Sequence, residues 1–558
     1  MEKRTLLAFA LCILVLVVWQ TLFYKPPKKV IKGQGEKAVP SQATSAEKKV
    51  KEEKKAKAPA PTKNIPGTIA LPKHTKPAME GKQVIVDTPY YKATFSSRGG
   101  VLKSFLLKKY RETIDMKSPP KELVRVKDRL FSPLLTEFLD HRNTGLAYAN
   151  FTPDRQELRL SKNDKSGNVR FSWESPEGIK VTKVFTFYPE SYLFDMEIGI
   201  VNESQKPFSD SLVLNVFNMP YQSEESRYNK NEISVLKTKK LLHFNEKKIL
   251  KSSPKITGPF EWLGYENNYF ISALIPKEIE GYSALINVMN ENTKLVRVAF
   301  VTPQIDLASR EKTKFGLRFF VGPKDLNVLK KVNYDLAKSI NFGWFDIIAK
   351  PLLWSMDFTN RYVHNYGIAI IIVTVIIKIL FWPLTHKSYQ SMKTMKKLQP
   401  KMAAMREKYK DDKEKLNKEL MGLYKTYKVN PVGGCLPMVL QIPVFFALYR
   451  MLYGAIELRH APFWLWINDL SAPDRLSIGF NIPYLGGLPV LTILMGVSMF
   501  IQQKMTPTGG DPRQEKLMLM MPVVFTVFFV NFPSGLVLYW LVNNILSIGQ
   551  QYFINKSA

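Results

Sequence analysis

Long apolar runs alternate with strongly polar segments at the start of the chain and throughout its C-terminal third. A membrane-spanning helix needs about 20 consecutive apolar residues, and a window of that length selects six candidate spans. They cover residues 6–23, 366–384, 433–453, 485–501, 517–530 and 536–553. The pattern therefore predicts an α-helical polytopic membrane protein with six transmembrane helices. The last three runs are short for a hydrocarbon core of roughly 30 Å, so these helices are expected to thin the bilayer or to face protein and water.

A different pattern fills residues 84–341. Runs rich in β-branched and aromatic residues, such as VTKVFTFYP at 181–189 and KTKFGLRFFVG at 312–322, alternate with turn sequences such as Arg98-Gly99-Gly100. Many short strands with few helical periods predict a β-sandwich. Residues 25–83 are rich in Lys, Ala, Pro and Glu, and we expect a disordered tether there. The first span resembles a secretory signal, but no small-residue cleavage pattern follows it, which favours a retained anchor at 1–24.

The distribution of basic residues orients the spans. Residues 385–430 hold thirteen Lys or Arg against five Asp or Glu, whereas residues 457–484 hold only two basic residues. Basic residues concentrate in cytoplasmic loops, so the first segment is predicted to be cytoplasmic and the second external. With six spans, both termini face the cytoplasm and the β-sandwich lies outside.

One ammonium group, Lys378, interrupts the second span, with Thr374 one helical turn before it. Ionisable side chains inside a spanning helix usually face water, a partner or a cavity, which makes Lys378 a candidate functional residue. Lys378 also lies within two turns of the end of the apolar run, so its stem could reach the headgroups as an ordinary anchor. From the residues alone, both interpretations stay open.

The pattern of the basic segment 385–430 predicts two helices, at 388–409 and 413–427, with Asp411 and Asp412 placed to cap the second. This predicts a cytoplasmic helical hairpin. Four methionines share one flank of its first helix: Met392, Met395, Met402 and Met405. Such a stripe is usually packing between two helices. Because the hairpin is too small to bury both faces, the methionines also suit contact with varied apolar partners, as in a chaperone.

Composition argues against several other classes of function. The two cysteines, Cys12 and Cys435, both lie at apolar segments, so neither a disulfide framework nor a metal cluster is indicated. No phosphate loop, cofactor site or clustered catalytic residues are visible, so we predict no enzyme. The formal net charge of +32 fits an anionic membrane surface or ribosomal RNA better than sequence-specific nucleic-acid recognition.

Three long stretches resemble the YidC/Oxa/Alb family of membrane-protein insertases. They are IIIVTVIIKILFWPLTHKSYQSMKTMKKLQPKM at 370–402, KVNPVGGCLPMVLQIPVFFALYRMLYGAIELRHAPFWLWINDLSAPD at 428–474 and MPVVFTVFFVNFPSGLVLYWLVNNILSIGQQ at 521–551. The similarity continues through the anchor, the tether, FSSRGG at 95–100 and FGWFDIIAKPLLW at 342–354, and so covers essentially the whole chain in order. The large external domain indicates the Gram-negative bacterial form.

The resemblance and the residue patterns together divide the chain. The predicted parts are an anchor (1–24), a tether (25–83), a periplasmic β-sandwich (84–341), an interfacial amphipathic helix (342–360), spans at 361–384, 431–456, 485–504, 517–531 and 534–554, a cytoplasmic hairpin (385–430), a periplasmic loop (457–484) and a cytoplasmic loop (505–516). The resemblance implies that the last five spans enclose a hydrated groove open to the cytoplasm and to lipid. It also implies that the sandwich is sugar-epimerase-like, without catalytic residues.

The resemblance implies a set of site residues. The groove would be lined by Lys378, Thr374, Gln441, Tyr539 and Trp540. The family's usual residue at 378 is Arg, and at 540 it is often Tyr, so this chain departs from the pattern at both positions. The apolar surface of the third and fifth spans would contact substrates through Met438, Phe445, Met521 and Phe525.

The implied function is insertion of integral membrane proteins into the bacterial inner membrane, and help with their folding and assembly, without a cofactor. The implied partners are nascent membrane proteins, the Sec translocon with its accessory subunits, the ribosome and the lipid bilayer. Two alternatives stay in view. A secondary transporter would use the intramembrane lysine but should show internal repeats. A membrane-anchored glycan-modifying enzyme would need clustered acids or a histidine site in the sandwich.

Overall fold

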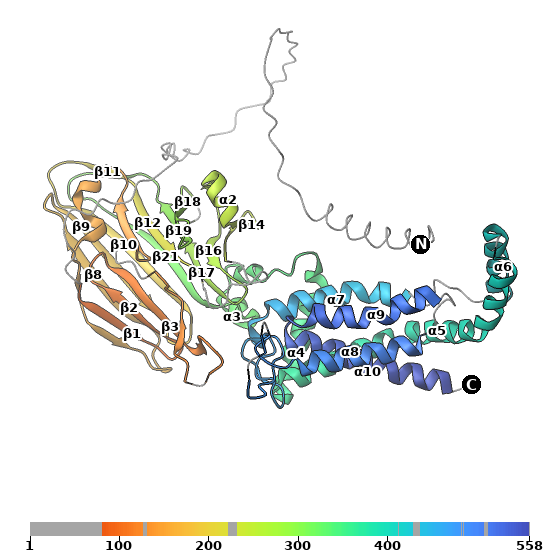
Figure 1. Cartoon of the computed structure of the whole chain (residues 1–558). Coiled ribbons are helices and arrows are strands. Elements are labelled where there is room, and N and C mark those ends of the chain that lie inside the picture. Colours follow the sequence, from red (N-terminus) through yellow and green to blue (C-terminus); the bar gives the residue numbers. More distant parts are fainter. Residues whose placement is uncertain are drawn as a thin grey trace, which may run out of the picture. The chain divides into compact units, whose positions relative to one another are not determined.

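The computed structural model describes residues 81–556, except 116, 127–130, 221–230, 279, 411, 428–435, 481, 484 and 507–511. The predicted anchor and nearly all of the predicted tether therefore lie outside the described residues. Strands predominate in the described chain up to Pro323, and helices predominate after it (Figure 1).

The largest sheet has nine strands, in the order β14-β13-β16-β17-β21-β10-β9-β8-β6. Their bounds are Lys240–Asn245 (β14), Glu232–Lys237 (β13), Trp262–Glu266 (β16), Phe270–Pro276 (β17), Lys312–Pro323 (β21), Leu193–Asn202 (β10), Ile179–Phe187 (β9), Gly167–Glu174 (β8) and Thr152–Pro153 (β6). Among the described residues, every pairing in this sheet is antiparallel. Two five-stranded sheets and one two-stranded sheet complete this region.

Twelve further strands form the three smaller sheets. The first consists of β4 (Pro120–Glu122), β3 (Val101–Arg111), β2 (Tyr91–Ser96), β1 (Gln83–Asp87) and β7 (Glu157–Arg159). The second consists of β15 (Lys255–Thr257), β18 (Ser283–Asn290), β19 (Leu295–Val301), β12 (Leu212–Asn218) and β5 (Leu135–Phe138). The two-stranded sheet pairs β11 (Phe208–Asp210) with β20 (Ile305–Leu307).

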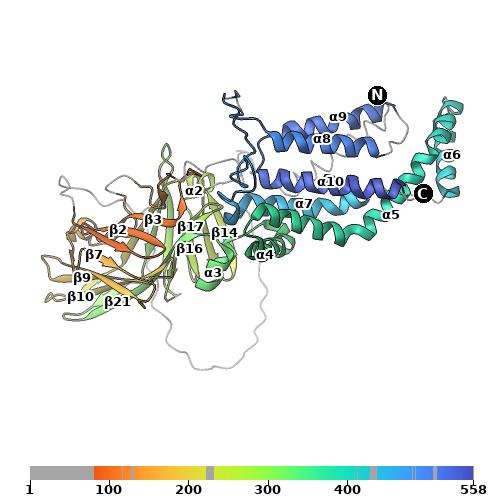
Figure 2. The ribbon, with the colours of Figure 1, turned by 90° about the horizontal axis from the view of Figure 1, so that it is seen from below.

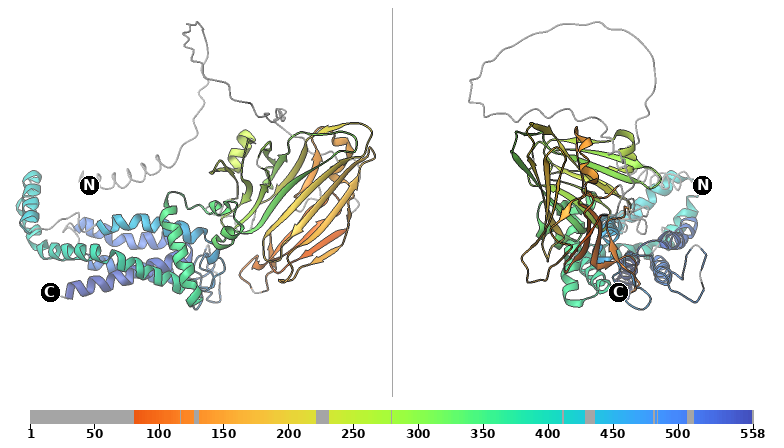
Figure 3. Two further views of the ribbon diagram at one scale, coloured as in Figure 1. Left: turned by 180° about the vertical axis from the view of Figure 1, so that it is seen from behind. Right: turned by 90° about the vertical axis from the view of Figure 1, so that its left-hand side faces the viewer.

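Alternating burial along the strands explains the sandwich. In β9 and β10 every second residue is buried, as expected for strands with one face in a core. Phe185 of β9 packs against Phe95 of β2, with ring centroids 4.8 Å apart, and Phe194 of β10 packs against Phe105 of β3 at 6.3 Å. The predicted β-sandwich is therefore confirmed (Figure 3).

The predicted turn at Gly99 and Gly100 is also present. Both glycines have positive φ, +74° and +56°, which L side chains rarely adopt. The buried Lys183 fixes this turn, because its Nζ donates to the Gly99 carbonyl at 2.5 Å.

Nine α-helices accompany the sheets in the described chain. They are α2 (Glu246–Ser252), α3 (Leu326–Val332), α4 (Asp346–Val363), α5 (Tyr366–Lys408), α6 (Lys413–Thr426), α7 (Leu436–Gly454), α8 (Val490–Met505), α9 (Pro512–Phe529) and α10 (Ser534–Lys556). Helix α10 contacts α5, α7 and α8, and α8 contacts α9, so these five helices form one bundle (Figure 2). Among the described residues, α5 is long and apolar enough to cross a membrane, whereas Val490–Met505 and Met518–Phe529 are shorter apolar helices.

Several helix bounds differ from the sequence-based expectation. Helix α9 begins at Pro512 rather than at 517, within the predicted cytoplasmic loop of 505–516. Helix α5 is continuous over 43 residues, where two separate helices were predicted. It passes through Pro383, which lacks an N–H, and the Thr385 hydroxyl lies within hydrogen-bonding distance of the Phe381 carbonyl, 3.0 Å away. Helix α8 begins at Val490 rather than at 485, because Gly486 has a φ of +78° and Pro489 precedes the helix. Helix α4 ends at Val363, beyond the predicted 360.

Candidate functional site

Lys378 of α5 lies against α10. Its Nζ donates to Ser547 Oγ at 2.6 Å, and the residue is 8% exposed. Ser547 Oγ in turn donates to the Asn543 carbonyl at 2.7 Å, one turn earlier in α10, which leaves an oxygen lone pair for the ammonium group. The charge is therefore held inside the helix bundle, in contact with another helix.

A small pocket adjoins this lysine. It is lined by Ile377, Lys378, Phe381, Leu384, Thr385 and Gln441. Two of the predicted groove residues, Lys378 and Gln441, thus share one pocket between α5 and α7. Gln441 Nε2 also donates to Asn543 Oδ1 of α10 at 2.9 Å, so the pocket's polar groups are linked to a third helix.

Polar contacts extend from the lysine along α10. Gln550 Nε2 donates to Thr385 Oγ1 of α5 at 2.9 Å, and Asn544 Nδ2 donates to Ser498 Oγ of α8 at 3.0 Å. Gln550 and Asn544 are both 2% exposed. Buried polar groups between apolar helices need such partners, and here the partners join α10 to α5 and to α8.

Two other predicted groove residues are buried. Thr374 is 1% exposed, and its hydroxyl donates to the Ile370 carbonyl of its own helix at 2.6 Å. Tyr539 is 3% exposed. Their side chains lie within the packed bundle rather than on an open surface.

Trp540 belongs to an aromatic cluster. Its ring centroid lies 4.6 Å from that of Phe445 of α7, 4.8 Å from that of Phe529 and 6.4 Å from that of Phe525, both of α9. The structure therefore joins this predicted groove residue to Phe445 and Phe525, which were predicted for the apolar surface. The tryptophan links α7, α9 and α10 by packing.

The outward face of α9 is apolar and exposed. Met521 is 43% exposed, Val523 63% and Val527 71%. Contiguous apolar surface of this kind typically marks contact with protein or membrane. The side chain of Met438, predicted for the same surface, lies outside the described residues.

The methionine stripe meets α6. Leu398 and Met402 of α5 and Leu423 of α6 are buried together, with Met395 and Met405 partly buried beside them. Much of the stripe is therefore packing between the two helices. Met392 is partly buried, but it is absent from this cluster.

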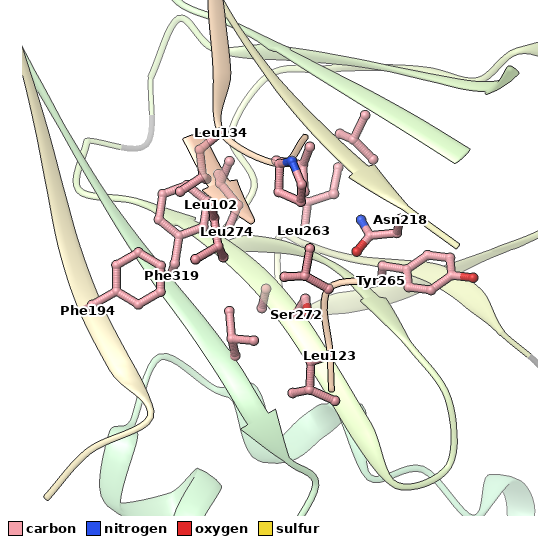
Figure 4. A pocket seen from close by; sticks show the side chains of 16 residues that line it. Leu102, Leu123, Leu134, Phe194, Asn218, Leu263, Tyr265, Ser272, Leu274 and Phe319 are labelled. Atoms are coloured by element: carbon pink, nitrogen blue, oxygen red, sulfur yellow. The ribbon is translucent and has the colours of Figure 1, made fainter. Parts of the chain in front are cut away.

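A cavity also lies between the sheets of the sandwich (Figure 4). Of its sixteen lining residues, only Asn218, Tyr265 and Ser272 carry polar side chains. None of these sixteen described residues carries a carboxylate, whereas glycoside hydrolysis uses a pair of them.

Tyr539 and Trp540 of α10 were predicted as groove residues, but three polar residues of the same helix were not. Asn543, Ser547 and Gln550 contact Gln441, Lys378 and Thr385 respectively. Their spacing of four and then three residues places them on one face of an otherwise apolar helix, which is the signal that could have identified them.

Comparisons with known proteins agree along the whole chain. Residues 83–355 match the family model described as YidC periplasmic domain, and residues 358–558 match the one described as 60Kd inner membrane protein. Proteins named Membrane protein insertase YidC from Syntrophobacter fumaroxidans and Syntrophus aciditrophicus are 47% and 44% identical, over 100% of this chain and of each relative. A solved structure, described as an active YidC insertase with the first transmembrane domain resolved, is 21% identical, covers 87% of this chain and 95% of that chain, and has a TM-score of 0.37. From the full-length identities and both family matches, the chain belongs to the family of YidC membrane protein insertases.

Proposed function

We propose that this protein inserts integral membrane proteins into the bacterial inner membrane and helps them to fold and assemble. Full-length relatives are named as insertases, and one matched family model describes an inner membrane protein. The observation that carries the mechanism is the Lys378 ammonium, buried against Ser547 within a bundle of apolar helices. Neither alternative, a secondary transporter or a glycan-modifying enzyme, is supported by these relatives.

The groove lowers the free-energy barrier for a polar segment that crosses the membrane. Moving a charged or unsatisfied polar group through hydrocarbon costs several kcal/mol. The polar groups of Lys378, Gln441 and Ser547 replace part of the lost hydration, and short helices shorten the dry path. The ammonium attracts acidic groups in the leading tail of a substrate, and no covalent bond needs to be broken.

The apolar segment of the substrate then leaves sideways into lipid. The exposed face of α9, including Met521 and Val527, offers a continuous apolar surface for this step. We assign Phe445, Phe525 and Trp540 to the wall behind that surface, because their rings pack together. Transfer of the segment into lipid supplies the driving force.

The proposed topology has six spans, with both termini in the cytoplasm. The sandwich lies in the periplasm, α4 lies along the outer membrane surface, and the hairpin of α5 and α6 lies in the cytoplasm. Support comes from the basic residues of 385–430 and from the exposed apolar side chains of α4, among them Ile347 at 86% and Trp354 at 58%. We further propose that the hairpin receives nascent chains near the ribosome and that the protein works alone or with the Sec translocon.

Purified protein in liposomes tests this function directly. A single-span substrate with an acidic tail, synthesised in the presence of these vesicles, should become protected from added protease. Empty liposomes and liposomes that hold an unrelated polytopic protein serve as controls. Equal protection in all three vesicle types would refute the proposal.

A further inference from the structure

Four polar side chains share one face of the sheet at its β14 end. Strand β13 pairs with β14 on one side and with β16 on the other (β14 and β16 are labelled in Figure 1). The register places Ser234 opposite His243 and Glu232 opposite Glu266. Residues that are directly opposite in an antiparallel pair project to the same face, and so do residues two apart in one strand. The backbone therefore brings two carboxylates, an imidazole and a hydroxyl together.

The donor atoms of this cluster lie close to one another. His243 Nδ1 is 3.0 Å from Glu232 Oε1 and 3.0 Å from Ser234 Oγ, and Ser234 Oγ also contacts Glu266 Oε1. One ligand atom from each of Glu232, His243 and Glu266 lies within 4.8 Å of the other two. Tetrahedral zinc with bonds of about 2.0–2.1 Å needs ligand atoms about 3.3 Å apart. Small side-chain movements would bring the three ligands to that spacing.

Charge and burial favour a cation here. Glu266 is 2% exposed, and like charges directly opposite in a sheet repel each other. Lys324 Nζ lies 2.8 Å from Glu266 Oε2 and so neutralises one side of that carboxylate, whereas Oε1 faces the cluster. As zinc ligands, a neutral imidazole and two carboxylates, together with the Lys324 ammonium, carry a net charge of −1 before the ion is added. A divalent cation would join both carboxylates without removing the lysine contact.

We propose that Glu232, His243 and Glu266 form a zinc site in the β-sandwich, with Ser234 Oγ or water as the fourth ligand. One imidazole and two carboxylates suit Zn²⁺, whereas Mg²⁺ and Ca²⁺ prefer oxygen ligands alone. The ion would link β14, an edge strand of the nine-stranded sheet, to β13 and β16. This site lies in the sandwich, apart from the groove residues, and does not depend on the proposed insertion mechanism.

Equilibrium dialysis of the tag-free, full-length protein in detergent against ZnCl₂ tests the site. We expect one zinc per chain. Replacing a ligand's hydrogen-bond partner alone commonly weakens metal affinity 10- to 100-fold, so Glu266→Gln and His243→Gln should each weaken binding at least 10-fold. His141→Gln is the matched control, because His141 pairs with one carboxylate, Asp210 Oδ2 at 2.8 Å, and should leave binding unchanged. Absence of stoichiometric zinc, or equal binding by all four proteins, would overturn the proposal.

A second variant gains a ligand and does not depend on loss of binding. Ser234→Cys places a thiolate where Ser234 Oγ meets His243 and Glu266, so zinc should bind more tightly and bound Co²⁺ should show thiolate charge-transfer absorption. The parent protein, which keeps Cys12 and Cys435, is the spectroscopic control. A Ser234→Cys spectrum identical to that of the parent would contradict the assignment.

Discussion

The charge of Lys378 is expected to select substrates by the charge of their tails. Lys378 is 8% exposed, and Ser547 Oγ holds its ammonium at 2.6 Å. The residue also lines a pocket together with Gln441. Lys378→Ala should reduce insertion of an acidic-tailed substrate more than that of a neutral one. Lys378→Glu should reduce it further by repulsion, whereas Lys378→Arg keeps the charge and should be tolerated.

The size of the effect follows from Coulomb's law. Two unit charges about 6 Å apart interact by roughly 0.7 kcal/mol in bulk water and by roughly 3 kcal/mol at an effective dielectric constant of about 20. The pocket lies between these limits, because Lys378 is largely buried but the proposed groove is hydrated. We therefore expect an attraction of about 1–3 kcal/mol, equivalent to a change of about 5- to 150-fold in the insertion ratio.

The assay compares two substrates that differ only in tail charge. Their insertion ratio is measured in a depletion strain at matched levels of wild type, Lys378→Ala, Lys378→Arg and Lys378→Glu. A membrane anchor would behave differently, because its loss would affect both substrates alike and a lysine moved to Phe381 or Leu384 would compensate. An unchanged ratio across the series would refute the electrostatic role.

Three further predictions concern the sandwich. Deletion of residues 83–323 should leave insertion in a depletion strain largely intact, and complete loss of insertion by a stably accumulated deletion protein would contradict an accessory role for the sandwich. A deletion that ends at Pro303 should accumulate poorly, because it keeps β21 but removes its partners β10 and β17. Arg297→Met should lower the unfolding free energy of the sandwich by about 3–5 kcal/mol, because the buried Glu137 carboxylate loses its guanidinium contact at 3.0 Å. Hydrogen exchange in β12 and β19 measures this change, and an effect below about 1 kcal/mol would show that the ion pair is dispensable. Burial lowers the pKa of Lys183 from 10.5 to about 7, so between these pH values the unfolded chain binds more protons than the folded one. The unfolding free energy should therefore rise with pH by up to about 1.4 kcal/mol per pH unit. Lys183→Met should lose this slope, and an identical slope in both proteins would refute the lowered pKa of Lys183.

Much of the sandwich could be predicted because its strands carry a period of two. The runs at 181–189 and 312–322 overlap β9 and β21, and Arg98-Gly99-Gly100 forms the expected turn. Strand order could not be predicted, because β21 inserts between β17 and β10, which are far apart in sequence. Such pairing depends on long-range packing that local periodicity does not encode.

In the helical bundle, hydropathy located the helices better than their ends. Five predicted spans fall on α5, α7, α8, α9 and α10, but the continuation of α5 into the basic segment was missed, because a proline such as Pro383 usually signals a helix boundary. Lys378 stood out as a charge in an apolar run. Its partner Ser547 did not, because a serine is common in apolar helices and only the packing of α5 on α10 brings the two together.

Photocrosslinking of nascent chains tests most directly the claim that a substrate passes through the groove. A photoreactive residue at Gln441 should crosslink to the leading tail of a substrate stalled during insertion, and one at Val527 of α9 should crosslink to its apolar segment. A probe at Ile347, 86% exposed on α4, is the control and should give neither product. Tail crosslinks from Gln441 are expected, and for an acidic tail they should weaken in Lys378→Glu. Normal insertion by the Gln441 probe variant without any tail crosslink would contradict it.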